Sequence, residues 1–216
     1  IGAGDDAQRN SPVQAGSATH WSAVTGDHDH SCAIRGGSLY CWGRNNVGQL
    51  GDGTSTPRSI PWQLGVLTTW TSVSAGDSHS CAIDSSDRLY CWGANDYGQI
   101  GNNGTAFVNT PYQVAGSWQS VSAGSAHTCA INTLGSTYCW GDNTFGQLGD
   151  TMVESSLTPL LIAGSYSQIS AGAYQTCALS GTDVYCWGLN DVGELGQGNT
   201  DPVAGPIKVL APAMGG

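Results

Sequence analysis

The sequence contains very little positive charge. Its 216 residues include only six lysines and arginines, with Lys208 as the sole lysine, against sixteen aspartates and glutamates. The resulting net charge of −10 repels the phosphate backbone of nucleic acids and the surface of anionic lipids. We therefore expect no nucleic-acid partner.

Long hydrophobic runs and helical periodicity are also missing. No stretch approaches the roughly 18 apolar residues of a membrane-spanning helix, so we expect no membrane insertion. No cleavable leader is visible, and few segments space apolar residues as an amphipathic helix does. The chain instead has 32 glycines and eight tryptophans. This composition predicts short, aromatic-rich strands joined by tight turns.

One repeat accounts for nearly the whole sequence. The tetrapeptide Tyr-Cys-Trp-Gly occurs four times, beginning at Tyr40, Tyr90, Tyr138 and Tyr185, which gives periods of 50, 48 and 47 residues. Each copy follows a Cys-Ala-Ile or Cys-Ala-Leu and precedes a Gly-Gln-Leu-Gly or a close variant of it. A period of this length with several short apolar segments is typical of a β-propeller blade.

The repeat predicts an all-β fold: a β-propeller-type array, within one domain (1–216), of four full blades of about four antiparallel strands each. The repeats run over 21–69, 70–117, 118–165 and 166–216. Ile1 to Pro12 reproduces the spacing from Leu195 to Pro206, so residues 1–20 should carry one extra outer-strand element with its loop. We expect a part of a larger propeller or a unit that assembles head to tail, rather than a closed four-bladed ring.

The repeating unit resembles a known family. Its consensus, W-x-S-V-S-A-G-x-x-H-x-C-A-I followed by L-Y-C-W-G-x-N-x-x-G-Q-L-G, is similar to the regulator of chromosome condensation repeat in its cysteine-bearing, bacterial-style form. The resemblance covers essentially the whole chain and implies a propeller, usually seven-bladed, that acts through protein contacts on its faces. The family's nuclear exchange-factor and chromatin roles require an intracellular protein, often with a basic tail, and are not carried over to this acidic chain.

The eight cysteines are spaced as four pairs, nine or ten residues apart. The pairs are Cys32 with Cys41, Cys81 with Cys91, Cys129 with Cys139, and Cys177 with Cys186. Turn-forming residues separate the members of each pair, so two adjacent antiparallel strands would place the sulfurs opposite each other. We interpret them as disulfides; reduced structural thiols are an alternative, and zinc is disfavoured because no Cys-x-x-Cys occurs. Disulfides imply an oxidising compartment, extracellular or at the cell surface.

Histidine recurs at one position of the repeat. His30, His79 and His127 occupy the same slot, which Gln175 fills in the fourth repeat, so we expect a hydrogen-bonding role there. His28 and His30 would share one face of a strand, which makes them a weak candidate for a metal site. We otherwise expect no metal, no catalytic residue and no cofactor.

The segment after each Gly-Gln-Leu-Gly varies between repeats and is the expected partner-binding loop. The candidate contact residues in these segments are Asp52, Arg58, Phe107, Val153, Glu154 and Asp201. Asn103, in Asn-Gly-Thr, is a weak candidate for N-glycosylation.

These patterns favour a non-catalytic extracellular protein that works through protein–protein contacts. Its partners would include other copies of itself if it is a head-to-tail building block of a surface layer or filament. The alternative is a closed ligand-binding propeller, either lectin-like with a glycan partner or an enzyme inhibitor. A hydrolase that uses loop carboxylates such as Asp52 or Glu154 is a third hypothesis, weakened because no catalytic motif is present.

Overall fold

The computed structural model describes residues 3–4, 10–11, 13–15 and 17–210, and this part of the chain is all-β. Its strands form four four-stranded antiparallel sheets, each with its strands in chain order. Blade 1 contains β1 (Trp21–Gly26), β2 (His30–Arg35), β3 (Ser38–Gly43) and β4 (Arg58–Gln63), and blade 2 contains β5 (Trp70–Ala75), β6 (His79–Asp84), β7 (Leu89–Gly93) and β8 (Val108–Val114). Blade 3 contains β9 (Trp118–Ala123), β10 (His127–Asn132), β11 (Ser136–Asp142) and β12 (Ser155–Ser165), and blade 4 contains β13 (Gln168–Ala171), β14 (Gln175–Ser180), β15 (Asp183–Gly188) and β16 (Val203–Lys208).

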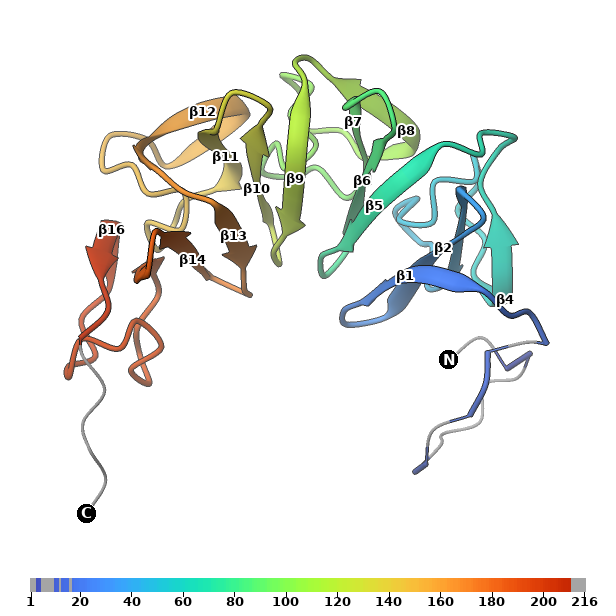
Figure 1. The fold of residues 1–216 in the computed structure, drawn as a ribbon, viewed down its shortest axis with the longest axis horizontal. Coiled ribbons are helices and arrows are strands. Elements are labelled where there is room, and N and C mark those ends of the chain that lie inside the picture. Colours follow the sequence, from blue (N-terminus) through green and yellow to red (C-terminus); the bar gives the residue numbers. More distant parts are fainter. Residues whose placement is uncertain (1–2, 5–9, 12, 16, 211–216) are drawn as a thin grey trace.

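The four blades stand side by side along an open arc, with blade 1 at one end and blade 4 at the other (Figure 1). The first strands of the blades, β1, β5, β9 and β13, contact one another in sequence along the inner side of the arc. The predicted propeller blades are therefore confirmed. The described residues contain no helix of the length and apolarity needed to cross a membrane.

Two glycines close the hairpin between β2 and β3. Gly36 and Gly37 have φ angles of 55° and 77°, which suit the two left-handed positions of a type I′ turn. Gly101, with a φ of 79°, also serves packing, because a Cβ built there would lie 2.9 Å from the indole nitrogen of Trp140 in the next blade.

The two central strands of each blade are joined by a disulfide. Every cysteine is paired, and the partners face each other directly across the two strands, with Cα atoms 4.1 Å apart. The bonds join Cys32 to Cys41, Cys81 to Cys91, Cys129 to Cys139 and Cys177 to Cys186. This confirms the predicted disulfide framework.

The hydrophobic core lies between blades rather than within them. One cluster joins Ile34 and Leu39 of blade 1 to Trp70 and Trp92 of blade 2, and two equivalent clusters join blades 2 and 3 and blades 3 and 4. The face of a blade that carries its disulfide, and that packs on the following blade, is called its trailing face. The opposite face, which carries the two tryptophans in blade 2, is its leading face. Each blade therefore depends on its neighbours for a buried core.

The extra outer-strand element expected in residues 1–20 falls largely outside the described residues. Where this segment is described, it contains no strand. The amide of Gly4 donates a hydrogen bond to the carbonyl of Ser59 in β4, 3.0 Å away, which places Gly4 beside the outermost strand of blade 1.

Removing one disulfide should destabilise the array measurably. Replacing both Cys81 and Cys91 with alanine opens a loop whose closure is worth about 2.5–3 kcal/mol in the chain-entropy model. We expect the free energy of unfolding, measured by urea titration under non-reducing conditions, to fall by at least this amount. Equal unfolding midpoints for the variant and the parent chain would contradict a stabilising role for this disulfide.

Candidate functional site

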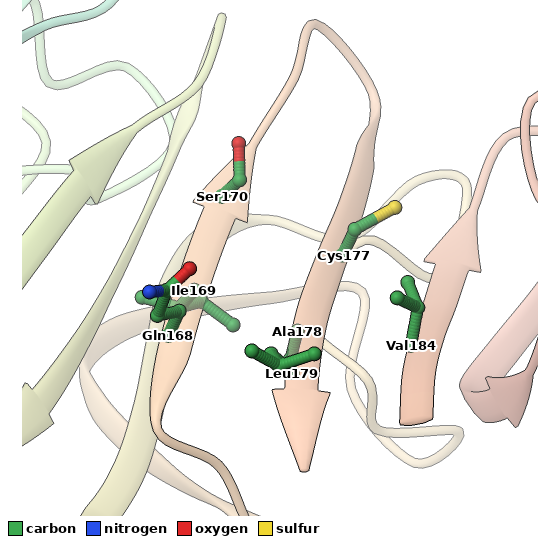
Figure 2. Close-up of a pocket in the computed structure, with 7 residues that line it drawn as sticks. All are labelled: Gln168, Ile169, Ser170, Cys177, Ala178, Leu179 and Val184. Atoms are coloured by element: carbon green, nitrogen blue, oxygen red, sulfur yellow. The ribbon is translucent and has the colours of Figure 1, made fainter. Parts of the chain in front are cut away.

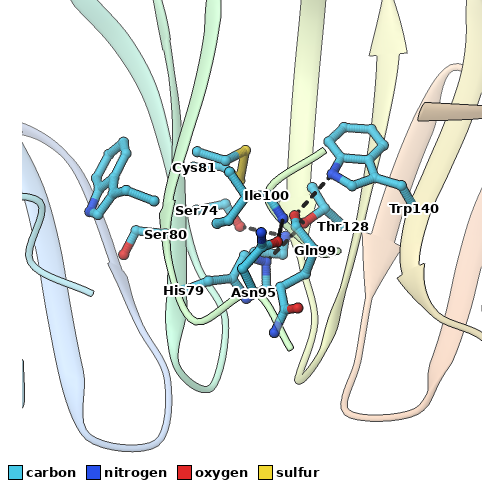
Figure 3. The surroundings of a disulfide bond; sticks show 12 residues. Ser74, His79, Ser80, Cys81, Asn95, Gln99, Ile100, Thr128 and Trp140 are labelled. Carbon is cyan, nitrogen blue, oxygen red and sulfur yellow. Dashed lines mark hydrogen bonds between the residues drawn. A yellow bond between two sulfur atoms is a disulfide. The ribbon is translucent and has the colours of Figure 1, made fainter. Parts of the chain in front are cut away.

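A chain of hydrogen bonds crosses each joint between blades. His79 Nε2 lies 2.8 Å from Thr128 Oγ1, and the Thr128 hydroxyl donates to the carbonyl of Gln99 at 2.8 Å (Figure 3). Since the hydroxyl proton is used there, His79 must donate from Nε2, which leaves Nδ1 without a proton. Trp140 Nε1 donates to the same carbonyl at 2.9 Å. We call this arrangement the joint relay, and it recurs as His30–Ser80–Gln49–Trp92 and His127–Thr176–Gln147–Trp187.

Burial keeps the relay histidines neutral. His30, His79 and His127 are at most 2% exposed, and desolvation of the charged ring lowers the pKa of His79 to about 3 and those of His30 and His127 to about 4. Each Nδ1 is buried with no hydrogen-bond partner in the described structure, so a proton added there would gain no acceptor. The predicted hydrogen-bonding role of this slot is confirmed.

The recurring tryptophans are also structural. Trp92, Trp140 and Trp187 are fully buried, and Trp42 is 6% exposed. The rings of Trp92, Trp140 and Trp187 pack in the joints, and Trp42 is buried beside Trp21, so none of the four is available for stacking on a sugar.

A buried asparagine shapes the long loop after the third strand of each blade. The Asn95 side chain accepts a hydrogen bond from the amide of Ile100 and donates to the carbonyls of Gly104 and Ala106. The equivalent residues, also buried, are Asn45, Asn143 and Asn190. Because these contacts fix the loop backbone from inside, the outward-facing side chains are free to differ between blades.

These long loops and the first turn of each blade lie at the same end of every sheet, as the antiparallel strand order requires. They form what we call the loop face, residues 27–29, 44–57, 76–78, 94–107, 124–126, 143–154, 172–174 and 189–202. This face holds ten of the sixteen carboxylates but only one of the six basic residues, Arg44, which pairs with Asp29 at 2.9 Å. Asp191 and Glu194 lie close enough that their hydrogen bond raises the pKa of Asp191. The loop face is therefore strongly acidic.

Exposed aromatic side chains accompany this charge. Tyr97, Phe145 and Tyr174 are 47%, 38% and 40% exposed, and the rings of Phe145 and Tyr174, from adjacent blades, meet edge to face with centroids 5.4 Å apart. Sequence reasoning missed all three. The sequence contained an indication for two of them, because Tyr97 and Phe145 replace the valines, Val47 and Val192, that the other two repeats have at this position.

The six predicted loop-contact residues divide into two groups. Asp52 and Arg58 pair with each other at 2.7 Å, with the Asp52 carboxylate buried, and the Arg58 guanidinium stacks on Trp62. Val153 packs against the core cluster between blades 3 and 4. The remaining three candidates are exposed on the loop face: Phe107, Glu154 and Asp201.

The Asp52 environment also bears on the hydrolase hypothesis. Although burial alone would raise the pKa of this carboxyl, hydrogen bonds from Thr54 and Arg58 lower it below its usual value. An ion-paired carboxylate of this kind is a poor proton donor. Its role in the structure is to hold the first long loop.

The sequence offered two weak candidate sites, a metal site at His28 and His30 and a glycosylation site at Asn103. The expectation that His28 and His30 share a strand face is wrong, because β2 begins at His30, which points into the joint, whereas His28 is exposed beside Asp29 and Asp77. No group of three or more metal-ligating side chains suited to an ion occurs among the described residues. Asn103 is exposed on the loop face, with a φ of 60°.

With this geometry established, the repeat can be compared with known families. The sequence matches "Regulator of chromosome condensation (RCC1) repeat" over residues 36–83, 86–131, 135–179 and 183–214, and a second description of the repeat over 70–99, 118–147 and 166–194. The chain belongs to the RCC1 repeat family. Propellers of RCC1 repeats are typically non-catalytic interaction domains, so the family supports a protein-binding role. No curated protein matches the sequence.

Several solved structures share the fold. Human WBSCR16 has a TM-score of 0.81 and 24% identity, covering 89% of this chain and 53% of its own. Yeast RCC1 (Prp20), crystallised with Kap60, has a TM-score of 0.80 and 20% identity, covering 90% and 49%. A structure of Prp20p from Saccharomyces cerevisiae, reported with its binding to Gsp1p and histones, has a TM-score of 0.80 and 21% identity, covering 90% and 51%. The chain thus spans about half the length of these relatives.

The relay histidines predict that stability falls in acid. Their pKa is about 6.5 in the unfolded chain and about 3 to 4 in the folded one. The unfolded state therefore binds more protons over this interval, so their stabilisation is complete above pH 6.5 and is lost as the pH falls toward 4. With three histidines the slope should approach about 4 kcal/mol per pH unit near pH 5, as measured by urea unfolding at pH 7, 6 and 5.

Blade 4 suggests the control, because Gln175 stands where the other blades have histidine. The His79→Gln variant keeps a side-chain donor near Thr128 but cannot titrate. We expect it to reduce the slope near pH 5 by about 1.4 kcal/mol per pH unit. An unchanged slope would show that His79 does not contribute to the acid sensitivity.

Proposed function

We propose that this RCC1-repeat chain is a non-catalytic extracellular protein that binds a basic protein through its loop face. The observation that carries the proposal is the coincidence of nine carboxylates, all those of the loop face except the ion-paired Asp52, with the exposed rings of Tyr97, Phe145 and Tyr174. Aromatic side chains supply binding energy at the centre of many interfaces. Surrounding charge of one sign favours association with a partner of the opposite sign.

The fold supports binding rather than catalysis. The polar side chains of the joints are occupied by the joint relay, and those at the loop bases by the asparagine contacts. The exposed side chains of the loop face include most of its carboxylates and its three aromatic rings, groups suited to recognition. Phe107, Glu154 and Asp201, on the same face, extend this surface to the longer loops.

The disulfides support the extracellular part of the proposal. Four disulfides in one chain are typical of oxidising compartments. The ectodomain of the Physcomitrella patens receptor kinase CR4 is similar in fold, with a TM-score of 0.54 and 22% identity over 84% of this chain and 44% of that one.

The partner can be sought by affinity selection. The immobilised chain is incubated with the secreted proteins of the organism that encodes it, and retained proteins are quantified by mass spectrometry. We expect the specifically retained proteins to be basic. Changing Phe145 and Tyr174 to serine should reduce their retention by about 30-fold, the loss that corresponds to about 2 kcal/mol at an interface hot spot.

The matched control is Leu134→Ser. Leu134 is 88% exposed in the turn between β10 and β11, at the opposite end of the sheet from the loop face, and its replacement should leave retention unchanged. Equal retention by the Phe145 and Tyr174 variant, with an unchanged thermal midpoint, would overturn the loop face as the binding surface.

A further inference from the structure

A surface cavity lies on the loop face between the long loop of blade 3 and the start of β16 in blade 4. It has a volume of about 260 Å³, and its lining includes Phe145, Asp150, Thr151 and Val153 of the loop and Pro202 and Ala204 of blade 4. Pockets that bury drug-sized molecules are typically larger, at about 300–1,000 Å³. The cavity therefore suits one side chain of a partner better than a free ligand.

The pocket shown in Figure 2 differs from this cavity. It lies on the trailing face of blade 4 and is lined mainly by apolar side chains, which include Leu179 and Val184. The equivalent residues of blade 1, Ile34 and Leu39, are buried in the core cluster shared with blade 2. The pocket in Figure 2 is thus part of a surface of the kind that packs between blades, and we infer no ligand for it.

The cavity lies where a contact between blades is missing. The amide of Gly53, in the long loop of blade 1, donates to the carbonyl of Asn109 in blade 2 at 2.9 Å. The amide of Asn103, in the loop of blade 2, likewise donates to the carbonyl of Leu157 in blade 3 at 2.9 Å. Thr151 is the equivalent residue of blade 3, and within the described structure its amide makes no backbone hydrogen bond to blade 4. This loop is therefore held less closely against the next blade.

A smaller side chain widens the same place. Leu157 in blade 3 and Ala204 in blade 4 are equivalent, because a Cβ built on the loop glycine of the preceding blade, Gly98 or Gly146, would clash with the Cα atom of each. The Leu157 side chain extends over Gly98, with Cδ2 2.6 Å from that Cβ position. Alanine has no atoms beyond Cβ, so the space that Leu157 covers at one joint stays open at the next.

Asp150 contributes a carboxylate that blade 3 does not neutralise. It occupies the position of Asp52 in blade 1, where Arg58 donates to Asp52 Oδ2 from Nε and Nη2 at 3.0 and 2.7 Å. Ser156 stands in the place of Arg58, since both residues pair with the equivalent glycine of the preceding strand. Blade 3 contains no lysine or arginine, and no basic side chain of the described part of the chain pairs with Asp150.

The free carboxylate is accessible from the cavity. Asp150 is partly exposed, and its Oδ1 accepts a hydrogen bond from the amide of Met152 at 2.7 Å. No hydrogen bond to Oδ2 occurs among the described residues. The one basic residue of blade 4, Lys208, pairs with Asp183 at 2.8 Å. A cation that pairs with Asp150 must therefore come from outside the described part of the chain.

Blade 1 shows which cation this combination of groups suits. There the guanidinium of Arg58 pairs with Asp52 and lies over the ring of Trp62, 4.2 Å from its centroid. In blade 3 the carboxylate of Asp150 and the exposed ring of Phe145 line one cavity. A guanidinium is planar, so it can donate two hydrogen bonds to a carboxylate while its face lies on an aromatic ring, which a lysine ammonium cannot do.

We propose that this cavity binds an arginine side chain of the basic partner, with Asp150 as its counter-ion and Phe145 as the ring on which the guanidinium lies. The inference rests on the proposed function, in which the loop face is the binding surface, and it names the group that this face recognises. The partner's arginine takes the place that Arg58 fills within blade 1. The exposed carboxylates of Glu154 and Asp201, each next in sequence to a residue of the cavity, strengthen the negative potential there.

Peptide titration tests the cavity directly. The isotope-labelled chain, with its disulfides intact, is titrated with acetyl-Gly-Arg-Gly-amide or with its lysine counterpart, and the backbone amide signals are followed by NMR. We expect the arginine peptide to shift the signals of Gly146, Thr151 and Ala204 in a saturable manner, and the lysine peptide to bind more weakly. The signals of Gly48, Gly53 and Asn109, at the equivalent place between blades 1 and 2, should not shift.

Two variants follow from the protein's own repeats. Asp150→Asn introduces the residue that blade 2 has at this position, Asn102, and should raise the dissociation constant of the arginine peptide by about 10-fold. Ser156→Arg introduces the arginine of blade 1, which should pair with Asp150 from within and weaken peptide binding by a similar factor. Because other blades carry these residues at the same positions, the fold should tolerate both changes.

Asp96→Asn is the matched control. Asp96 is exposed on the loop face in blade 2, outside the cavity, so this variant removes the same unit charge without changing the cavity. Its dissociation constant for the arginine peptide should change by less than about twofold, because salt screens exposed charges at a distance.

The opposite results overturn the proposal. Equal affinities of the Asp150→Asn and Asp96→Asn variants reject Asp150 as the counter-ion, and equal affinities for the arginine and lysine peptides reject recognition of a guanidinium. The absence of shifts at the cavity at any peptide concentration rejects the cavity as a site. If only the cavity fails, basic proteins should still be retained by the parent chain and lost from the Phe145 and Tyr174 variant, which distinguishes this failure from failure of the loop-face proposal.

Discussion

The structure depends on one buried carbonyl at each joint between blades. Each of these carbonyls, at Gln49, Gln99 and Gln147, accepts two hydrogen bonds from the following blade. One comes from a side-chain hydroxyl and the other from an indole N–H. A buried carbonyl that lost these donors would pay the cost of desolvation without compensation, so the contact fixes the spacing and angle of adjacent blades. The glycines beside it allow the tryptophan ring to approach, and the histidine behind the hydroxyl sets its orientation.

This arrangement separates stability from recognition. The joints contain the disulfides, the tryptophans and the relay histidines, and almost none of them reaches the loop face. The loops are held at their base by a buried asparagine that contacts mainly backbone atoms. Because backbone contacts do not depend on the identity of the loop side chains, Tyr97, Phe145 and the loop carboxylates can vary without disturbing the blades.

Most of the fold, but less of the candidate site, could be predicted from the sequence. The four blades, the disulfides and the histidine role follow from a repeat seen four times, since a local pattern repeated in each blade has one structural meaning. Asp52 and Arg58 were predicted as partner contacts, whereas they form an ion pair with each other. This pair occurs in one repeat only, so no periodic pattern in the sequence indicates it. The Phe145–Tyr174 contact joins two blades, and sequence spacing alone does not reveal such a meeting.

The distribution of charge separates the loop face from the joints. The carboxylates concentrate on the loop face, whereas the joints are formed mainly by apolar and neutral polar side chains. Blades can therefore pack with little direct repulsion across a joint, although the chain carries a net charge of −10. A basic partner that spanned the loops of neighbouring blades would gain from the combined field of their carboxylates and from several sets of contacts.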